Sequence, residues 1–301
     1  MSNPVKNCMF AFPDRVIPND YVTPVLSGPE GGWVEEGDVS LANLQNPDRS
    51  LVARSVDADP NNTVIEFDLG TERSIQAMAL LDHNLSLEAL VRYTFFTSAD
   101  RNVLVDGGDS DVLPVWLTFF PPATLPWGHP SLWDGKILPE DRNGRNFDFI
   151  RTLSAMVVSR WGRLEITDPN NPNGFIELSR MPLAPAWQPA RNMSWGASIK
   201  YESNATSDRS RYGKRYVDET ALWREVTCRL QHIEPGVAES IILEMQYHLG
   251  KTGELLFIFD PTDQYQAMWQ RSFLAQMEEL NPIDYVGFRN NETGFKLVER
   301  L

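Results

Sequence analysis

From residue 1 to about residue 189, the sequence consists of short apolar runs separated by Pro, Gly, Asn and Asp, with almost no apolar spacing of the helical kind. Residues 64–70 alternate apolar and polar side chains and end at glycine, a pattern typical of a half-buried strand. Residues 75–81 follow after a short polar turn, and residues 91–96 are rich in strand-forming side chains. Further strands are expected at 155–158, 161–167 and 175–178. The pattern predicts an all-β domain.

The length and one proline-rich stretch predict a second domain. A chain of 301 residues is near the size, roughly 250–300 residues, at which a single core divides into two. Pro182, Pro185 and Pro189 lie within eight residues and form a stiff connector. We therefore expect domains at 1–189 and 190–301.

The second domain combines strands with one helix. Residues 235–249 carry apolar side chains at helical spacing, with Pro235 in the first turn and Gly250 as the C-terminal cap. Strands are expected at 195–201, 222–233, 254–259 and 273–280, and residues 202–214 are expected to form a loop. The predicted class is mainly β: an all-β N-terminal domain and a C-terminal α+β domain with one packed helix.

The charge balance excludes some partners. With 27 Lys and Arg against 41 Asp and Glu, the formal net charge is −14. Nucleic-acid binding needs clustered cations that displace counterions from phosphates, so no nucleic-acid site is expected. No apolar run reaches the roughly 18 residues of a membrane span, and the residues before Pro18 lack a signal-peptide core. We expect protein, sugar or small-molecule partners.

The sequence carries no recognisable catalytic or metal-binding motif. His83, His129, His232 and His248 lie on separate segments, and Cys8 and Cys228 are far apart. Neither set has the short spacing of a zinc site, and no nucleophile elbow, phosphate-binding loop or dinucleotide motif is present. We expect no cofactor, no metal and no enzymatic activity. A carboxylate pair for glycoside hydrolysis stays open, because separation in space is not visible in a sequence.

A long irregular insertion, at about 121–145, interrupts the first domain. Aromatic side chains in and before it are candidates for glycan or partner contact: Trp116, Trp127, His129 and Trp133. Aromatic faces stack on the C–H surface of sugar rings. The alternative is that these residues anchor the insertion to the sandwich or to a neighbouring subunit, since buried aromatic anchors dominate protein interfaces.

A basic stretch on this acidic chain is the second candidate. Within residues 202–215 the cations are Arg209, Arg211, Lys214 and Arg215. Such a segment can pair with carboxylates of a neighbouring subunit. The alternative is a solvated hairpin tip, since exposed ion pairs contribute little.

Several segments resemble a known family. Residues 43–54, 64–70, 75–85 and 163–166 (Arg-Leu-Glu-Ile) are similar to the discoidin-like, or galactose-binding-like, jelly-roll sandwich, over about residues 40–180. The His-Asn-Leu at 83–85 and the segment 171–180 resemble tailed-bacteriophage proteins encoded among tail-tip genes. In the second domain, residues 234–261 and 271–274 resemble the β-sandwich-plus-helix unit of tail-tube and distal tail proteins. The resemblance implies an N-terminal jelly-roll β-sandwich and a C-terminal α+β, tail-tube-like β-sandwich with one packed helix.

The resemblance implies a structural subunit of a phage tail tip or baseplate, forming a ring at the distal end of the tail. Its partners would be tube, hub and fibre proteins and copies of itself. Its location would be the virion, after synthesis in the bacterial host cytoplasm. The alternative is a carbohydrate-binding module or receptor-binding adhesin that recognises a cell-surface glycan. A glycan-degrading enzyme is the third hypothesis.

Overall fold

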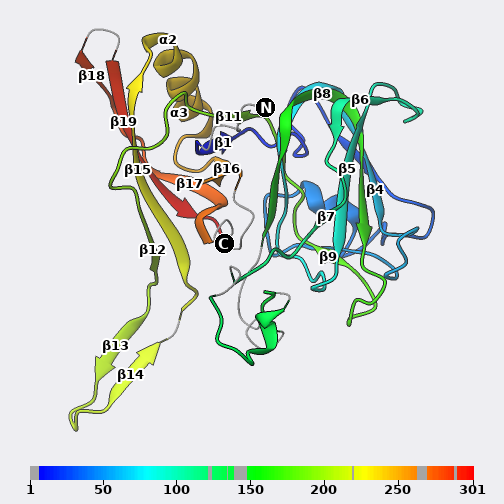
Figure 1. Ribbon diagram of the computed structural model, residues 1–301, viewed down its shortest axis with the longest axis horizontal. Coiled ribbons are helices and arrows are strands. Elements are labelled where there is room, and N and C mark those ends of the chain that lie inside the picture. The colour runs from blue at the N-terminus through cyan, green and yellow to red at the C-terminus, as the bar shows by residue number, and fades with distance from the viewer. Residues whose placement is uncertain are drawn as a thin grey trace. The chain divides into compact units, whose positions relative to one another are not determined.

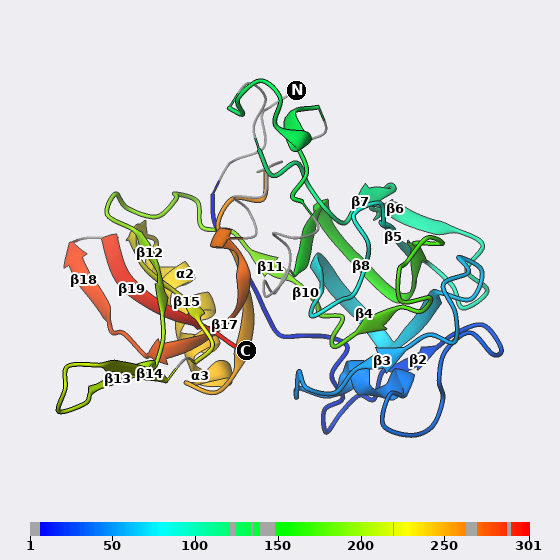
Figure 2. The same ribbon diagram turned by 90° about the horizontal axis from the view of Figure 1, so that it is seen from below.

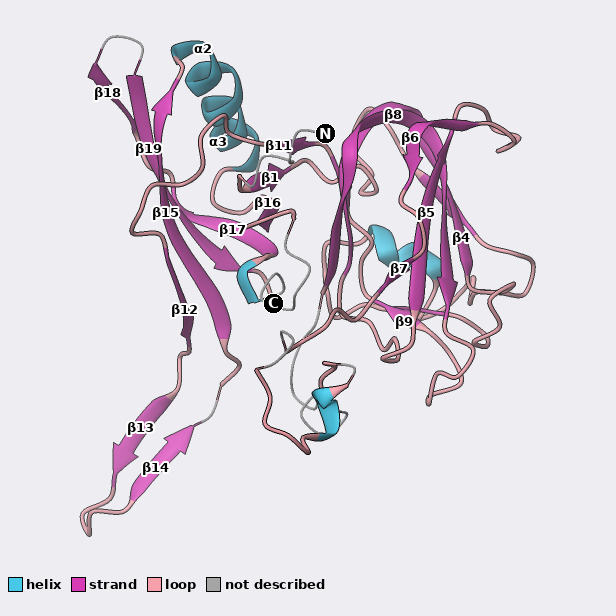
Figure 3. Ribbon diagram, in the orientation of Figure 1, coloured by secondary structure: helices cyan, strands magenta, loops and turns pink. Residues whose placement is uncertain are grey.

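The computed structural model describes residues 7–120, 124–133, 135–138, 148–218, 220–262, 270–287 and 290–301. Strands dominate it (Figure 3), and the neighbouring strands within each sheet run antiparallel, so the mainly β prediction is confirmed. The chain divides into two compact units. The first comprises Met1–Trp187 and Ile258–Phe273, and the second comprises Gln188–Phe257 and Leu274–Leu301. The return of Ile258–Phe273 to the first unit is a feature that the proline-rich connector does not predict.

The first unit is built around a sheet in the order β10-β4-β8-β5-β6, with β2 paired to β4 and β7 paired to β5 (Figure 1). The strands are β2 (Val25–Ser27), β4 (Val64–Leu80), β5 (Leu90–Phe96), β6 (Leu104–Asp109), β7 (Leu113–Pro114), β8 (Phe149–Thr167) and β10 (Leu183–Ala184). Smaller antiparallel pairs are β3 (Ala53–Arg54) with β9 (Glu177–Leu178) and β1 (Met9–Ala11) with β11 (Ala186–Trp187). Two short 3₁₀ turns lie between strands of this unit. One is η1 (Leu41–Gln45), between β2 and β3 in the sequence, and the other is η2 (Pro130–Leu132), between β7 and β8.

Two strands of this unit are longer than the sequence predicts. The expected strands at 64–70 and 75–81 form one continuous strand, β4, which ends at Leu80, and residues 155–158 and 161–167 belong to β8. The pairing of β4 with β8 runs from Val64 opposite Glu165 to Leu80 opposite Phe149, with irregularities after Asp68 and after Ile75. Gly70 has a φ of +75°, a conformation that glycine adopts without strain, so the strand bends there without ending.

The core of the first unit follows the alternation of these strands. Ile65, Phe67 and Leu69 of β4 are fully buried, and they lie in one cluster with Tyr93 and Leu164 of the neighbouring strands. Period-two alternation places every second side chain on the same face of a sheet, which is why this pattern was readable in the sequence.

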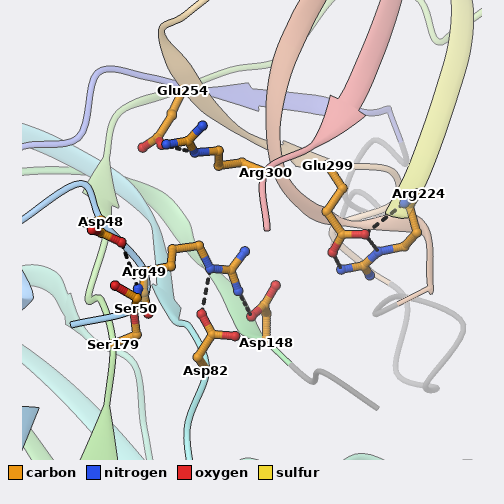
Figure 4. A network of polar contacts seen from close by, with 10 residues as sticks. All are labelled: Asp48, Arg49, Ser50, Asp82, Asp148, Ser179, Arg224, Glu254, Glu299 and Arg300. Carbon is orange, nitrogen blue, oxygen red and sulfur yellow. Dashed lines mark hydrogen bonds and ion pairs between the residues drawn. The ribbon is translucent and has the colours of Figure 1, made fainter. Parts of the chain in front are cut away.

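Buried charges also hold the first unit together. Arg49 donates to Asp82 at 2.6 Å and to Asp148 at 3.1 Å, and its side chain is almost fully buried (Figure 4). Arg180, which has no exposed surface, donates to Asp14 at 3.1 Å. Buried ions need partners of opposite charge, so these contacts link segments that are distant in sequence.

The second unit contains a sheet in the order β16-β17-β19-β15-β12, with β18 also paired to β19. Its strands are β12 (Ser198–Glu202), β15 (Trp223–Ile233), β16 (Glu254–Ile258), β17 (Phe273–Glu279), β18 (Ile283–Gly287) and β19 (Asn290–Glu299). Val226, Cys228 and Leu230 of β15 are buried on one face, as the alternation predicts.

The predicted helix is present with its predicted bounds. It comprises α2 (Pro235–Val237), a π-helical segment, η3 (Ala238–Leu243), and α3 (Glu244–Leu249), and it lies against the sheet (Figure 2). Its buried side chains are Ala238, Ile242, Met245 and Leu249. Gly250 caps it with a φ of +53° and donates its backbone N–H to Gln246 O at 2.9 Å. The π-helical turn has no counterpart in the apolar spacing.

The loop expected at residues 202–214 is instead part of a hairpin. β13 (Thr206–Arg209) and β14 (Arg215–Asp218) pair with each other and extend beyond the ends of β12 and β15 (Figure 1). The sequence did not predict these two strands, because neither has a buried face that would create an alternation of apolar and polar residues.

Candidate binding surfaces

Three of the four aromatic candidates come together in the insertion of the first unit. Trp127 and Trp133 lie edge to face, with ring centroids 6.2 Å apart, and they are 88% and 85% exposed. His129 lies between them in sequence, and its ring contacts the edge of Phe120 at 5.8 Å. We call Trp127, His129 and Trp133 the aromatic loop. Residues 121–123, 134 and 139–145 of the expected insertion lie outside the described residues.

Local hydrogen bonds explain how the aromatic loop is held. His129 caps the turn η2, because its Nδ1 accepts the backbone N–H of Ser131 at 3.1 Å, and Pro130 takes the first position of the turn. The backbone N–H of Gly135 donates to Ser131 O at 2.9 Å. The loop therefore presents two indole rings to solvent from an ordered turn.

Trp116 is not part of this surface, so the prediction that it contacts a glycan or partner is wrong. It is 3% exposed, and its Nε1 donates to Leu85 O at 3.2 Å. Its ring also meets His83 edge to face at 6.0 Å. Trp116 belongs to the core, where a buried indole needs an acceptor for its N–H.

The four basic candidates lie together on the hairpin of β13 and β14. Arg209 stands directly opposite Arg215, and Arg211 and Lys214 lie in the connecting turn. The turn is closed by Ser210 N–H to Lys214 O at 2.8 Å and by Gly213, whose φ is +83°. The Lys214 ammonium lies 5.4 Å from the centre of the Tyr216 ring. We call residues 206–218 the basic hairpin.

The basic hairpin has no core of its own. Every residue of β13 and β14 is exposed, which means that both faces of the two-stranded ribbon meet solvent. At its base, the Glu202 carboxylate accepts a hydrogen bond from Lys200 at 2.5 Å, which raises the pKa of Lys200 and lowers the pKa of Glu202. The opposed Arg209 and Arg215 repel each other across the ribbon.

Within the residues that the structure describes, no three His, Cys, Asp or Glu side chains are grouped closely enough to hold a metal ion. The carboxylates of half-buried Asp82 and buried Asp148 share the guanidinium of Arg49, an arrangement that fixes structure. Over the same residues, no helix is long and apolar enough to cross a membrane.

A third surface was missed by the sequence analysis. Trp195, read only as the start of a strand, is fully exposed beside a groove of about 550 Å³ in the second unit. Its position directly before Gly196, in a turn that precedes β12, is the signal that could have marked it.

No protein-family model matches the chain, and no curated protein matches it. Among solved structures, it is similar to the family 32 carbohydrate-binding module of Clostridium perfringens NanJ in complex with galactose, with 13% identity over 60% of this chain and 99% of that chain, at a TM-score of 0.34. A chitosan-binding module from Paenibacillus sp. IK-5 is 9% identical over 57% of this chain and 98% of that chain, with a TM-score of 0.32.

A Ruminococcus gnavus GH29 fucosidase in complex with fucose is 8% identical over 58% of this chain, with a TM-score of 0.35. The chain spans only a minor part of the glycoside hydrolases that it matches: 27% of this fucosidase, 28% of SpGH29 and 14% of a family 89 glycoside hydrolase from Clostridium perfringens.

Proposed function

We propose that the chain is a non-catalytic structural subunit that assembles with copies of itself through the basic hairpin. The observation that carries this proposal is the exposure of β13 and β14 on both faces. A lone two-stranded hairpin is marginally stable in water, so a hairpin of this kind gains its stability from a partner.

Charge supports a second copy as that partner. The basic hairpin carries four cations against the carboxylates of Asp208 and Asp218, whereas the whole chain has a formal net charge of −14. Complementary charge accelerates association and sets the register of an interface. A head-to-tail contact of this kind closes into a ring where the rotation between subunits allows it.

The setting that we propose for this assembly is a phage tail tip or baseplate within the virion, with tube, hub and fibre proteins as neighbours. This setting rests on the resemblance of residues 83–85, 171–180 and 234–261 to tail proteins. Particles assembled without the chain that carry complete, infectious tails would contradict it.

The assembly is tested by light scattering and negative-stain imaging of the native chain and of Arg211→Glu/Lys214→Glu. The native chain is expected to form oligomers that dissociate in high salt, because exposed charges are screened there. The hairpin variant is expected to be monomeric with an unchanged circular dichroism spectrum. Arg191→Glu/Lys251→Glu reverses two exposed cations elsewhere in the second unit and should assemble like the native chain.

Two results would contradict the assembly. One is a native chain that stays at 34.2 kDa at every concentration. The other is a hairpin variant that forms the same oligomers as the native chain.

A specific observation favours a second function, glycan binding by the aromatic loop. Trp127 and Trp133 are large apolar rings held in solvent, and aromatic rings of this kind stack on sugars. A glycan array should lose its signal with Trp127→Ala/Trp133→Ala and keep it with Tyr21→Ala, which removes another highly exposed aromatic ring of the first unit. An array response that is equal for the native chain and the double variant would exclude this function.

A further inference from the structure

The Trp195 groove lies on the face of the second unit's sheet that carries the side chains of Thr227, Arg229 and Gln231. The alternate residues of β15, Val226, Cys228 and Leu230, are buried on the opposite side. Residues 194–197, Asn281, Pro282, Asp284 and Gly294 complete the walls. A volume of about 550 Å³ falls within the roughly 300–1,000 Å³ that is typical of small-ligand sites.

The rim of the groove is held in place by the backbone. Ser194 N–H donates to Arg229 O at 2.8 Å, and Gly196 has a φ of +101°, which lets the chain turn sharply into β12. Trp195 lies between these two residues and is fully exposed. The indole is therefore carried on a defined turn beside the groove, as a flat apolar surface that no side chain of the described chain covers.

The floor of the groove is open because residue 294 has no side chain. A Cβ added to Gly294 would stand in this space, 3.5 Å from Asn281 Nδ2. Asn281 Nδ2 donates to Gly294 O at 3.1 Å, which fixes the amide and leaves its Oδ1 as an acceptor for a ligand. The floor thus has open space above Gly294 next to the oriented side-chain amide of Asn281.

The charges at the groove argue against an anionic ligand. Arg229 Nη2 lies 2.7 Å from the Glu292 carboxylate and 3.9 Å from the Asp284 carboxylate. The guanidinium is already balanced, so a phosphate or sulfate would meet no excess positive charge, whereas anion sites depend on such an excess.

We infer that the Trp195 groove binds a neutral saccharide. The Trp195 ring would stack on the C–H face of a sugar, while Asn281, Asp284 and Arg229 would exchange hydrogen bonds with its hydroxyls. The inference is independent of the assembly through the basic hairpin, and it concerns a different unit from the aromatic loop.

The test uses the full chain on an array of neutral oligosaccharides, followed by calorimetric titration with the sugar that gives the strongest signal. Trp195→Ala and Gly294→Val should each weaken binding at least about tenfold, since one removes the stacking surface and the other fills the floor. Valine suits a strand, and its Cβ meets only ordinary contacts, so Gly294→Val should fold normally. Tyr247→Ala removes another highly exposed ring of the second unit, outside the groove, so it is the matched control and should bind this sugar like the native chain. Trp127→Ala/Trp133→Ala is titrated beside it to show whether the first unit binds the same sugar.

Three outcomes would overturn the inference. The first is a native chain that retains no neutral saccharide, and the second is native affinity in both groove variants. In the third case, binding is lost only in Trp127→Ala/Trp133→Ala, which would assign it to the first unit. Because the oligomeric state of each variant is measured by light scattering, a failure of saccharide binding is distinguished from a failure of assembly.

Discussion

Glu299, at the end of β19, accepts hydrogen bonds at 2.8 Å from both the backbone N–H and the side-chain Nε of Arg224, at the start of β15 (Figure 4). The two side chains form a forked ion pair and are almost completely buried. The pair fixes the register of the two strands that run beneath the Trp195 groove.

Glu299→Gln is expected to lower the free energy of unfolding of the second unit by about 3 kcal/mol, because it leaves the charge of Arg224 buried without its partner. Urea unfolding followed by circular dichroism measures this change. Glu202→Gln, which alters an exposed ion pair with Lys200, should remain close to the native chain. Equal unfolding curves for the two variants would show that the buried pair contributes no more than the exposed one.

Gly162→Ala is expected to destabilise the first unit by about 1–3 kcal/mol, as overpacked cores generally do. An added Cβ at position 162 would overlap the ring of Phe67, which is fully buried. Gly236→Ala is the control: its Cβ would meet open space at the start of the helix, so its stability should match or exceed that of the native chain. Thermal unfolding compares the two variants, and a native-like Gly162→Ala would refute the close packing.

Substitutions of the three tryptophans that the sequence analysis proposed as contact residues should differ in their effect on the free energy of unfolding. Trp116→Ala is expected to cost about 3–5 kcal/mol, because it opens a cavity in the core. Trp127→Ala/Trp133→Ala should change the free energy of unfolding by less than about 0.5 kcal/mol, since neither ring is packed. Chemical unfolding of both variants checks this, and comparable losses would mean that the aromatic loop is packed rather than exposed.

Asp68 should contribute to stability only above acidic pH. Its carboxylate accepts hydrogen bonds from Arg160 at 2.6 and 2.8 Å, which lower its pKa below the usual 3.8. A carboxyl whose pKa is lower in the folded state stabilises the fold above its unfolded pKa, and this contribution disappears as the pH falls through the folded pKa.

Asp68→Asn should therefore show a smaller loss of stability than the native chain between about pH 5 and pH 2, and a lower stability at neutral pH. Urea midpoints measured across that range test the prediction. Asp20→Asn, at an exposed position, should follow the native chain. A parallel pH dependence for native chain and Asp68→Asn would exclude the contribution.

Local patterns were enough for the regular elements. The helix from Pro235 to Leu249 was readable because its buried side chains recur at helical spacing between a proline and a glycine cap. The core faces of β4 and β15 were readable because one side of each strand is buried. Where neither face is buried, as in β13 and β14, no periodicity exists and the strands were read as a loop.

The sequence by itself determined the mainly β class, the long helix and several strands, among them β4, β5, β8 and β15, because these depend on the spacing of apolar residues along the chain. Only the tertiary structure decided that Trp116 is buried while Trp127 and Trp133 are exposed, that Arg209 faces Arg215, and that Trp195 borders a groove with Gly294. The physical reason is that burial and proximity arise from contacts between segments distant in sequence. The type of a residue does not show which distant segment will cover its side chain.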